Sequence, residues 1–75
     1  MFYELHLIAT GHYIFEVVDD TTKRTLESYT ILDCSTEQGN SYKVYPMFEE
    51  EKAQLANSLV QAQEIAKADY NTRGI

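Results

Sequence analysis

Residues 48–70 read FEEEKAQLANSLVQAQEIAKADY and carry the clearest helical pattern of the chain. The apolar positions recur at intervals of three and four residues and are Leu55, Leu59, Ala62 and Ala66. This spacing places them on one face, so the stretch predicts an amphipathic helix over about 47–70. Pro46 suits the first turn of such a helix, although no Ser, Thr, Asp or Asn occupies the expected cap position. Because the stripe is rich in alanine, we expect the helix to lie close against a flat surface.

The chain ahead of this helix alternates between apolar and polar residues, which is typical of β-strands. Strands are predicted over about 2–9, 13–19, 25–33 and 41–45, with turn-forming residues between them. With the helix, they predict an α+β fold: an antiparallel meander of three or four strands, followed by one long C-terminal helix packed on one face. We expect a single domain over residues 1–75, with a small core that is only marginally stable alone.

The turn at residues 10–12 decides how the first two strands pair. A three-residue loop sets Leu7 opposite Phe15 and also sets His6 opposite Glu16. A two-residue loop would exchange the two faces of one strand relative to the other, so burial favours the longer loop. Three-residue loops prefer glycine at their last position, which this turn does not provide.

One helix covers only one face of the sheet, so apolar residues on the other face have to be covered by something other than this helix. The facing of the third strand stays open, since either Tyr29 and Ile31 or their neighbours can face the helix. The expected dimer or docking face holds Phe2, Ile8, Ile14 and Val18, with Tyr70 on a helix end that extends past the sheet. An apolar second face marks an interaction surface, so we expect a homodimer, sheet against sheet or with exchanged helices. Scattered exposed apolar residues, which are normal on monomers, are the alternative.

The net charge of −6 repels nucleic acid backbones and favours a protein partner with a basic surface. We expect no direct contact with nucleic acid and no membrane partner. The residues expected to meet basic groups are Glu4, Glu16, Asp19, Asp20, Glu27, Glu49, Glu50 and Glu51. The alternative is that these charges serve solubility alone.

Six tyrosines supply large, amphipathic side chains of the kind enriched at protein interfaces. Aromatic side chains on a sheet can also stack on RNA bases, but that function needs basic residues around them. The predicted strands contain few basic residues, so RNA binding is not expected. Core tyrosines with hydroxyl groups at the rim are the other alternative.

No combination of residues matches a specific catalytic or metal-binding pattern. His6 and Glu16 are expected to form a surface pair, and His6, His12 and Cys34 lack the spacing of zinc ligands. Cys34 is expected to be a buried or half-buried structural thiol, since nothing nearby would activate it. We therefore expect no enzyme activity, no cofactor and no metal.

The single cysteine excludes an internal disulfide, and the first residues carry no signal-peptide pattern, so we expect a cytoplasmic protein. In size, charge and architecture the chain resembles the small inhibitor proteins of phages and mobile elements, some of which block basic clefts by imitating nucleic acid. That general resemblance, which no family motif carries, implies an acidic module that binds and inhibits a nucleic-acid-handling protein. The alternative is a structural or assembly subunit whose main partner is itself.

Overall fold

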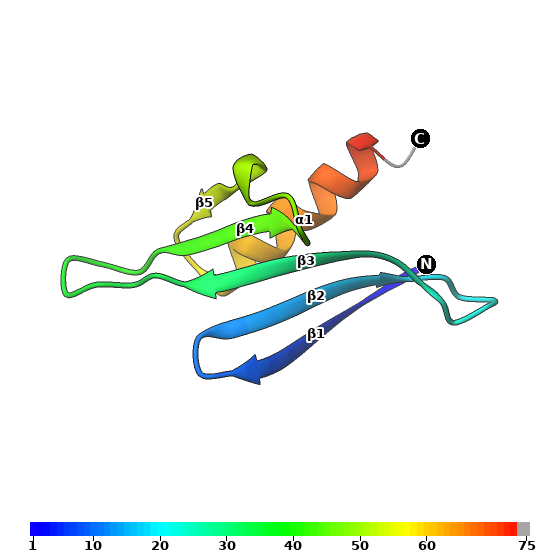
Figure 1. Ribbon diagram of the computed structural model, residues 1–75, viewed down its shortest axis with the longest axis horizontal. Coiled ribbons are helices and arrows are strands. Elements are labelled where there is room, and N and C mark those ends of the chain that lie inside the picture. Colours follow the sequence, from blue (N-terminus) through cyan, green and yellow to red (C-terminus); the bar gives the residue numbers. More distant parts are fainter. Residues whose placement is uncertain (74–75) are drawn as a thin grey trace.

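The computed structural model describes residues 1–73 as one antiparallel sheet with a single helix on one face (Figure 1). The strands lie side by side in chain order and are β1 (Phe2–Ala9), β2 (His12–Val18), β3 (Thr25–Asp33), β4 (Tyr42–Pro46) and β5 (Gln54–Ala56). A single 3-10 turn, η1 (Glu50–Lys52), precedes β5, and the helix α1 spans Leu59–Arg73. The predicted α+β fold, a meander followed by a C-terminal helix, is confirmed, with five strands rather than three or four.

The helix begins at Leu59, so the predicted range of 47–70 was wrong at its start. Ser58 is the cap: its Oγ accepts a hydrogen bond from the backbone N–H of Gln61 at 3.0 Å. The side chain of Gln61 reaches back and accepts a hydrogen bond from the N–H of Asn57 at 2.5 Å. This Ser-x-x-Gln arrangement is a variant of the capping box, which satisfies N–H groups that a helix start leaves free.

The chain before this cap makes a turn and a strand, and not helix. The N–H of Glu49 donates to the carbonyl of Pro46 at 2.9 Å, and Phe48 within this turn has a φ of 71°. A left-handed residue interrupts a right-handed helix, so the predicted helix cannot run through Phe48. After η1 the chain extends, and β5 pairs with β4. Leu55, expected on the buried helical stripe, therefore lies on an edge strand with 72% of its surface exposed.

The core lies between the sheet and α1, which packs against β3, β4 and β5. Its buried side chains are Phe15, Val17, Tyr29, Ile31, Val44, Ala56, Ala62 and Ala66. The third strand thus turns Tyr29 and Ile31 toward the helix, which settles the facing that the sequence left open. Ala62 and Ala66 are completely buried, so the expected close approach of an alanine-rich stripe to the sheet is confirmed.

The first hairpin pairs the expected faces in a register that differs from the predicted one. Leu7 lies opposite Tyr13 and not opposite Phe15, and the loop is only two residues long. An irregularity between Leu7 and Ala9 inserts one extra residue into β1, as in a β-bulge. The extra residue restores the pairing of apolar faces that a two-residue loop would otherwise exchange. Gly11, with a φ of 72°, provides the left-handed position of this short loop.

Two expectations about exposed apolar residues were wrong. Val18 is buried, so it is not part of an open docking face. Tyr70 packs against the core, and Ala66 before it is completely buried, so this part of α1 does not extend past the sheet. Phe2 and Ile14 are half-buried, and Ile8 is exposed.

Within residues 1–73, no helix is long and apolar enough to cross a membrane.

Candidate protein-binding surface

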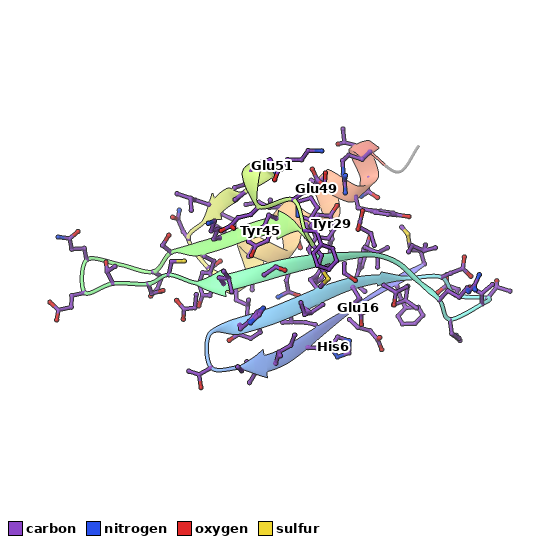
Figure 2. The ribbon with its side chains drawn as sticks, in the orientation of Figure 1. His6, Glu16, Tyr29, Tyr45, Glu49 and Glu51 are labelled. Carbon is purple, nitrogen blue, oxygen red and sulfur yellow. The ribbon has the colours of Figure 1, made fainter. Side chains whose placement is uncertain are left out.

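The acidic residues nominated from the sequence do not gather into one patch. Figure 2 shows His6 of β1 beside Glu16 of β2 near one edge of the sheet, whereas Glu49 and Glu51 lie near η1, toward the opposite edge. The remaining members lie on β1, in the β2–β3 loop, on β3 and in η1, and are Glu4, Asp19, Asp20, Glu27 and Glu50. Each group therefore has to be assessed by the contacts that it makes within the chain.

Glu4 and Glu16 lie directly opposite each other, and His6 contacts both. Nε2 of His6 is 2.8 Å from Oε1 of Glu16 and 3.7 Å from Oε1 of Glu4. His6 itself lies opposite Ile14, so the expected His6–Glu16 contact exists as a diagonal one and the predicted register was wrong. Facing carboxylates form a like-charge pair that destabilises a hairpin, and the imidazole lies between these two.

These three side chains also place one ligand atom each within 4.8 Å of one another. Glu4 and His6 are exposed on an open sheet face, where water competes for any cation and nothing fixes the ligand geometry. Among residues 1–73 this is the one such group of three, so His6, His12 and Cys34 do not come together. The cluster is a contact between one imidazole and two carboxylates on an open surface.

Asp19 and Asp20 stabilise the β2–β3 loop. Oδ1 of Asp19 accepts hydrogen bonds from the N–H groups of Thr22 and Thr21, each at 2.8 Å. These two backbone donors hold the pKa of Asp19 below its ordinary value. Asp20 forms an ion pair with the ammonium group of Met1. Both aspartates are therefore engaged by the fold, as expected for residues of a turn.

Arg73 joins the end of α1 to β3 and to the turn before η1. Its guanidinium lies 2.8 Å from Oε2 of Glu27, 2.9 Å from Oδ2 of Asp69 and 3.6 Å from Oε2 of Glu49. Glu49 also pairs with Lys52 at 2.8 Å, and that hydrogen bond lowers the pKa of the Glu49 carboxyl. Glu27 and Glu49 thus have structural roles that the sequence did not reveal.

Glu50 and Glu51 differ in how far the fold engages them. Glu50 pairs with Lys43 of β4 at 2.6 Å, a hydrogen bond that raises the pKa of the lysine. Glu51 is exposed and takes part in no ion pair found among residues 1–73. Its charge therefore remains available to a second molecule.

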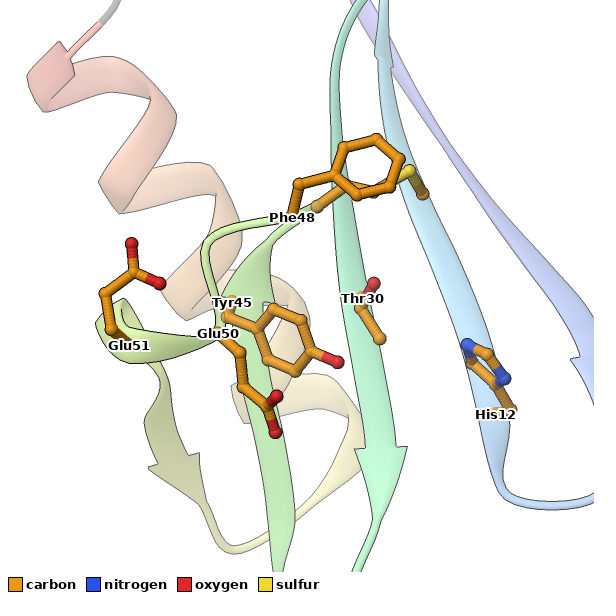
Figure 3. A pocket seen from close by; sticks show the side chains of 7 residues that line it. His12, Thr30, Tyr45, Phe48, Glu50 and Glu51 are labelled. Atoms are coloured by element: carbon orange, nitrogen blue, oxygen red, sulfur yellow. The ribbon is translucent and has the colours of Figure 1, made fainter.

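A shallow cleft of about 400 Å³ opens beside these residues, on the face of the sheet opposite α1. Its lining comes from β2, β3, β4 and the following turn, and consists of His12, Thr30, Tyr45, Met47, Phe48, Glu50 and Glu51. Figure 3 shows Tyr45, Phe48 and His12 arranged around Thr30, which is buried. The cleft thus combines aromatic side walls with an acidic rim.

Phe48 is the feature of this region that fold stability does not explain. Its side chain is 94% exposed, and its backbone adopts the left-handed conformation that favours glycine. That conformation costs a residue with a side chain about 1–2 kcal/mol. An exposed aromatic ring on a strained backbone is the kind of local conflict that concentrates at functional sites. The sequence pattern does not single out Phe48, because the helical spacing places this residue inside the predicted helix.

The tyrosines are mostly part of the core. Tyr29 is buried, and four others pack against the core cluster and are Tyr3, Tyr13, Tyr42 and Tyr70. Tyr45 lies on the opposite face, in the cleft. A row of tyrosines suited to stacking on bases is therefore absent from the described part of the chain.

Cys34 is exposed, so the expectation of a buried or half-buried thiol was wrong. The chain leaves the sheet immediately before it, because the side chain of Asp33 accepts a hydrogen bond from the N–H of Ser35 at 2.9 Å and turns the backbone. The N–H of Cys34 itself donates to the carbonyl of Ser41 at 2.7 Å across the β3–β4 loop.

A scan of protein-family models matches none of them to this chain, and neither the curated proteins nor the solved structures contain a match.

Proposed function

We propose that this chain is a small non-enzymatic module that binds a partner protein through the Phe48 corner, defined as residues 47–51. The observation that carries the proposal is Phe48, 94% exposed at a φ of 71° beside a run of glutamates. Large aromatic side chains that fill a pocket on the partner frequently act as interface hot spots. The backbone strain is explained if the conformation presents the ring to a partner.

The chemistry of the corner defines the partner. Phe48 and Met47 require an apolar pocket, and Glu51 on the rim of the cleft, which has no ion pair within residues 1–73, requires lysine or arginine beside that pocket. The net charge of −6 adds long-range attraction for a basic surface, which raises the rate of association at low salt. The partner class is therefore a protein with a basic rim around an apolar pocket.

The corner is held in place before it binds. Its turn is closed by the hydrogen bond from Glu49 to Pro46, and the Glu49 carboxylate is fixed by Lys52 and Arg73. A surface that is already ordered loses less conformational entropy on binding. The ion pairs of Glu49 therefore support binding by positioning Phe48 rather than by contacting the partner.

Inhibition of a nucleic-acid-handling protein stays a prediction within this proposal, since such proteins are one source of basic clefts. A cytoplasmic location also belongs to the proposal. The exposed, unpaired thiol of Cys34 suits a reducing compartment, where exposed thiols are not driven into disulfides.

The test is a selection of random peptides displayed on phage against the immobilised wild-type protein. We expect enriched peptides to combine lysine or arginine with two or more apolar residues, and their affinity to fall with added salt. Enrichment of acidic or purely apolar peptides, or no enrichment above an unrelated acidic protein of similar size, would contradict the proposal.

Matched variants then locate the binding surface for a synthetic peptide of the selected sequence. Phe48→Gly is expected to weaken binding about 30-fold or more, as removal of a hot spot does. Leu55→Ala is the control, because Leu55 is also largely exposed but lies outside the corner. Glu51→Lys is expected to weaken binding about threefold, in contrast to Glu37→Lys in the β3–β4 loop. If a variant at the corner and its control weaken peptide binding equally, the binding site lies elsewhere.

A further inference from the structure

β1 forms a long edge of the sheet that no other part of the described chain covers. Figure 1 shows it as the outermost strand, and only β2 pairs with it. β1 is 8 residues long, whereas β5 at the opposite edge has 3. An exposed edge presents a row of free N–H and C=O groups, and proteins normally keep such edges short or place lysine or proline on them. β1 contains neither residue, and its bulge, which also protects an edge, comes only after Leu7 near the end of the strand.

The side chains of β1 are also incompletely covered on the helix side. α1 packs against β3, β4 and β5, so Leu7 is left 66% exposed and Leu5 37% exposed. These two leucines lie on the same face as the buried Phe15, which is opposite Leu5 in β2. The apolar layer of the core therefore continues to the edge of the sheet and ends there without cover.

Elementary strand geometry limits how β1 can pair with a second copy of itself. Antiparallel strands place hydrogen-bonded positions opposite hydrogen-bonded ones, and free positions opposite free ones. When two identical strands pair in this way, the two-fold axis that relates them must therefore pass beside one residue of each strand. It cannot pass between two neighbouring residues of the same strand. The middle of β1 offers Glu4, Leu5 and His6 as centres.

Centring on Leu5 makes the strand complementary to itself. The pairs across the axis are Phe2 with Ile8, Tyr3 with Leu7, Glu4 with His6, and Leu5 with its own copy. Apolar residues meet apolar residues, and each carboxylate meets an imidazole. The stretch from Tyr3 to Leu7 precedes the bulge of β1, so these central pairs are regular.

The other two centres pair unsuitable residues. Centring on Glu4 sets this carboxylate opposite its own copy, and centring on His6 sets Glu4 opposite Ile8. Like charges directly opposite each other destabilise a sheet, and the apolar side chain of Ile8 offers a carboxylate neither a hydrogen bond nor an opposite charge. Charge complementarity thus selects one register.

We propose that two copies of this chain associate through β1, antiparallel and centred on Leu5, to form one continuous sheet with both helices on the same face. Leu5, Leu7 and Tyr3 of each copy then lie in the strip between the two helices. This arrangement differs from the sheet-against-sheet dimer expected from the sequence, because Leu5, Leu7 and Ile8 are exposed on the edge strand β1, whereas Val18 of the expected docking face is buried. It leaves the Phe48 corner of each copy free, since that corner follows β4 at the far side of the sheet.

The first test is sedimentation equilibrium up to about 1 mM protein, a range that detects association as weak as roughly 4 kcal/mol. We expect a species of twice the 8.6 kDa chain mass. Leu7→Lys is expected to abolish it, while Leu55→Lys, at a similarly exposed leucine on the other edge, leaves it unchanged. Only the monomer mass at every concentration, or a dimer that survives Leu7→Lys, would overturn the proposal. Circular dichroism establishes that both variants are folded.

The second test reads the register and does not depend on those variants. In a Cys34→Ser background, single cysteines are placed at positions 4, 5 and 6 and oxidised. Only Leu5→Cys is expected to crosslink, since a disulfide needs Cα atoms within about 7 Å. In the Leu5-centred register, the copies of residue 4 or of residue 6 are offset by roughly 7 Å along the strand in addition to the spacing between strands. Faster crosslinking at position 4 or 6, or none at position 5, contradicts the register.

Discussion

The hydroxyl group of Tyr29 donates a 2.6 Å hydrogen bond to Oδ2 of Asp69, and so connects the middle strand of the sheet to the last turns of α1. Arg73 completes the group, with its Nε 2.9 Å from the same Asp69 oxygen. The predicted tyrosine core is thus tied to the helix by a charged hydrogen bond as well as by apolar packing. Since Arg73 also reaches Glu49, this group contributes to the position of the Phe48 corner.

Tyr29→Phe removes the hydroxyl group and keeps the buried ring. We expect the free energy of unfolding to fall by about 1.5 kcal/mol, as for the loss of a hydrogen bond to a charged group. Urea unfolding followed by circular dichroism measures the change. Tyr13→Phe is the control, because the structure gives that hydroxyl no hydrogen bond to another side chain within residues 1–73. An unchanged midpoint for Tyr29→Phe would show that the bond contributes nothing.

The same tyrosine predicts a dependence of stability on alkaline pH. Burial, and then the hydrogen bond to Asp69, raise the pKa of Tyr29 from 10.0 to about 12. Between these values the unfolded chain has lost the phenolic proton and the folded chain keeps it. Stability from this group is therefore complete below pH 10 and is lost as the pH rises toward 12. Unfolding midpoints across this window should fall more steeply for the wild type than for Tyr29→Phe, and parallel slopes would contradict the assignment.

Phe48→Gly is expected to make the fold more stable while it removes the proposed anchor. Glycine adopts the φ of 71° without strain, so the free energy of unfolding should rise by about 1 kcal/mol. For a domain of this size that corresponds to a melting temperature higher by roughly 4–8 °C. Phe48→Ala keeps the strained backbone and serves as the control. If glycine is no more stabilising than alanine at this position, the strain attributed to Phe48 is absent.

Ser58→Ala is expected to lower the free energy of unfolding by about 1 kcal/mol, because it leaves the first N–H groups of α1 without their side-chain acceptor. Ser58→Asp supplies an alternative acceptor and should retain most of the stability. Thermal unfolding by circular dichroism distinguishes the two. Equal losses in both variants would mean that Ser58 acts through its backbone alone.

Much of this fold follows from local pattern. Alternation predicted the first four strands but left open which face of the third strand is buried, and the alanine stripe predicted the buried side of α1. The start of the helix was missed because Leu55 continued the helical spacing by coincidence, while Ser58 and Gln61 already marked the cap. The strand β5 is too short to show any period, and its pairing with β4 depends on the turn at Phe48.

The candidate site depended on contacts between residues far apart in the chain. No local sequence pattern predicts that Arg73 pairs with Glu27. Such contacts determine which carboxylates remain available to a partner. The predicted register of the first hairpin was wrong because of a bulge in β1. The bulge changes which residues pair without changing the alternation of apolar and polar residues. Residue types and charge predict an acidic partner surface, which stays a prediction, and the proposal that this surface lies around Phe48 depends on the structure.

The most direct test of the proposed binding surface at residues 47–51 is a two-dimensional amide NMR titration of the wild-type protein with a peptide from the phage selection. The proposal predicts that the largest shifts occur at residues 47–51 and at Thr30 and Tyr45 of the adjoining cleft. It also predicts that all of these chemical-shift changes become smaller when the same peptide is added to the Phe48→Gly variant. Saturable binding with its largest shifts on β1 or on α1, and none at Phe48, would contradict the assignment of the Phe48 corner as the binding surface.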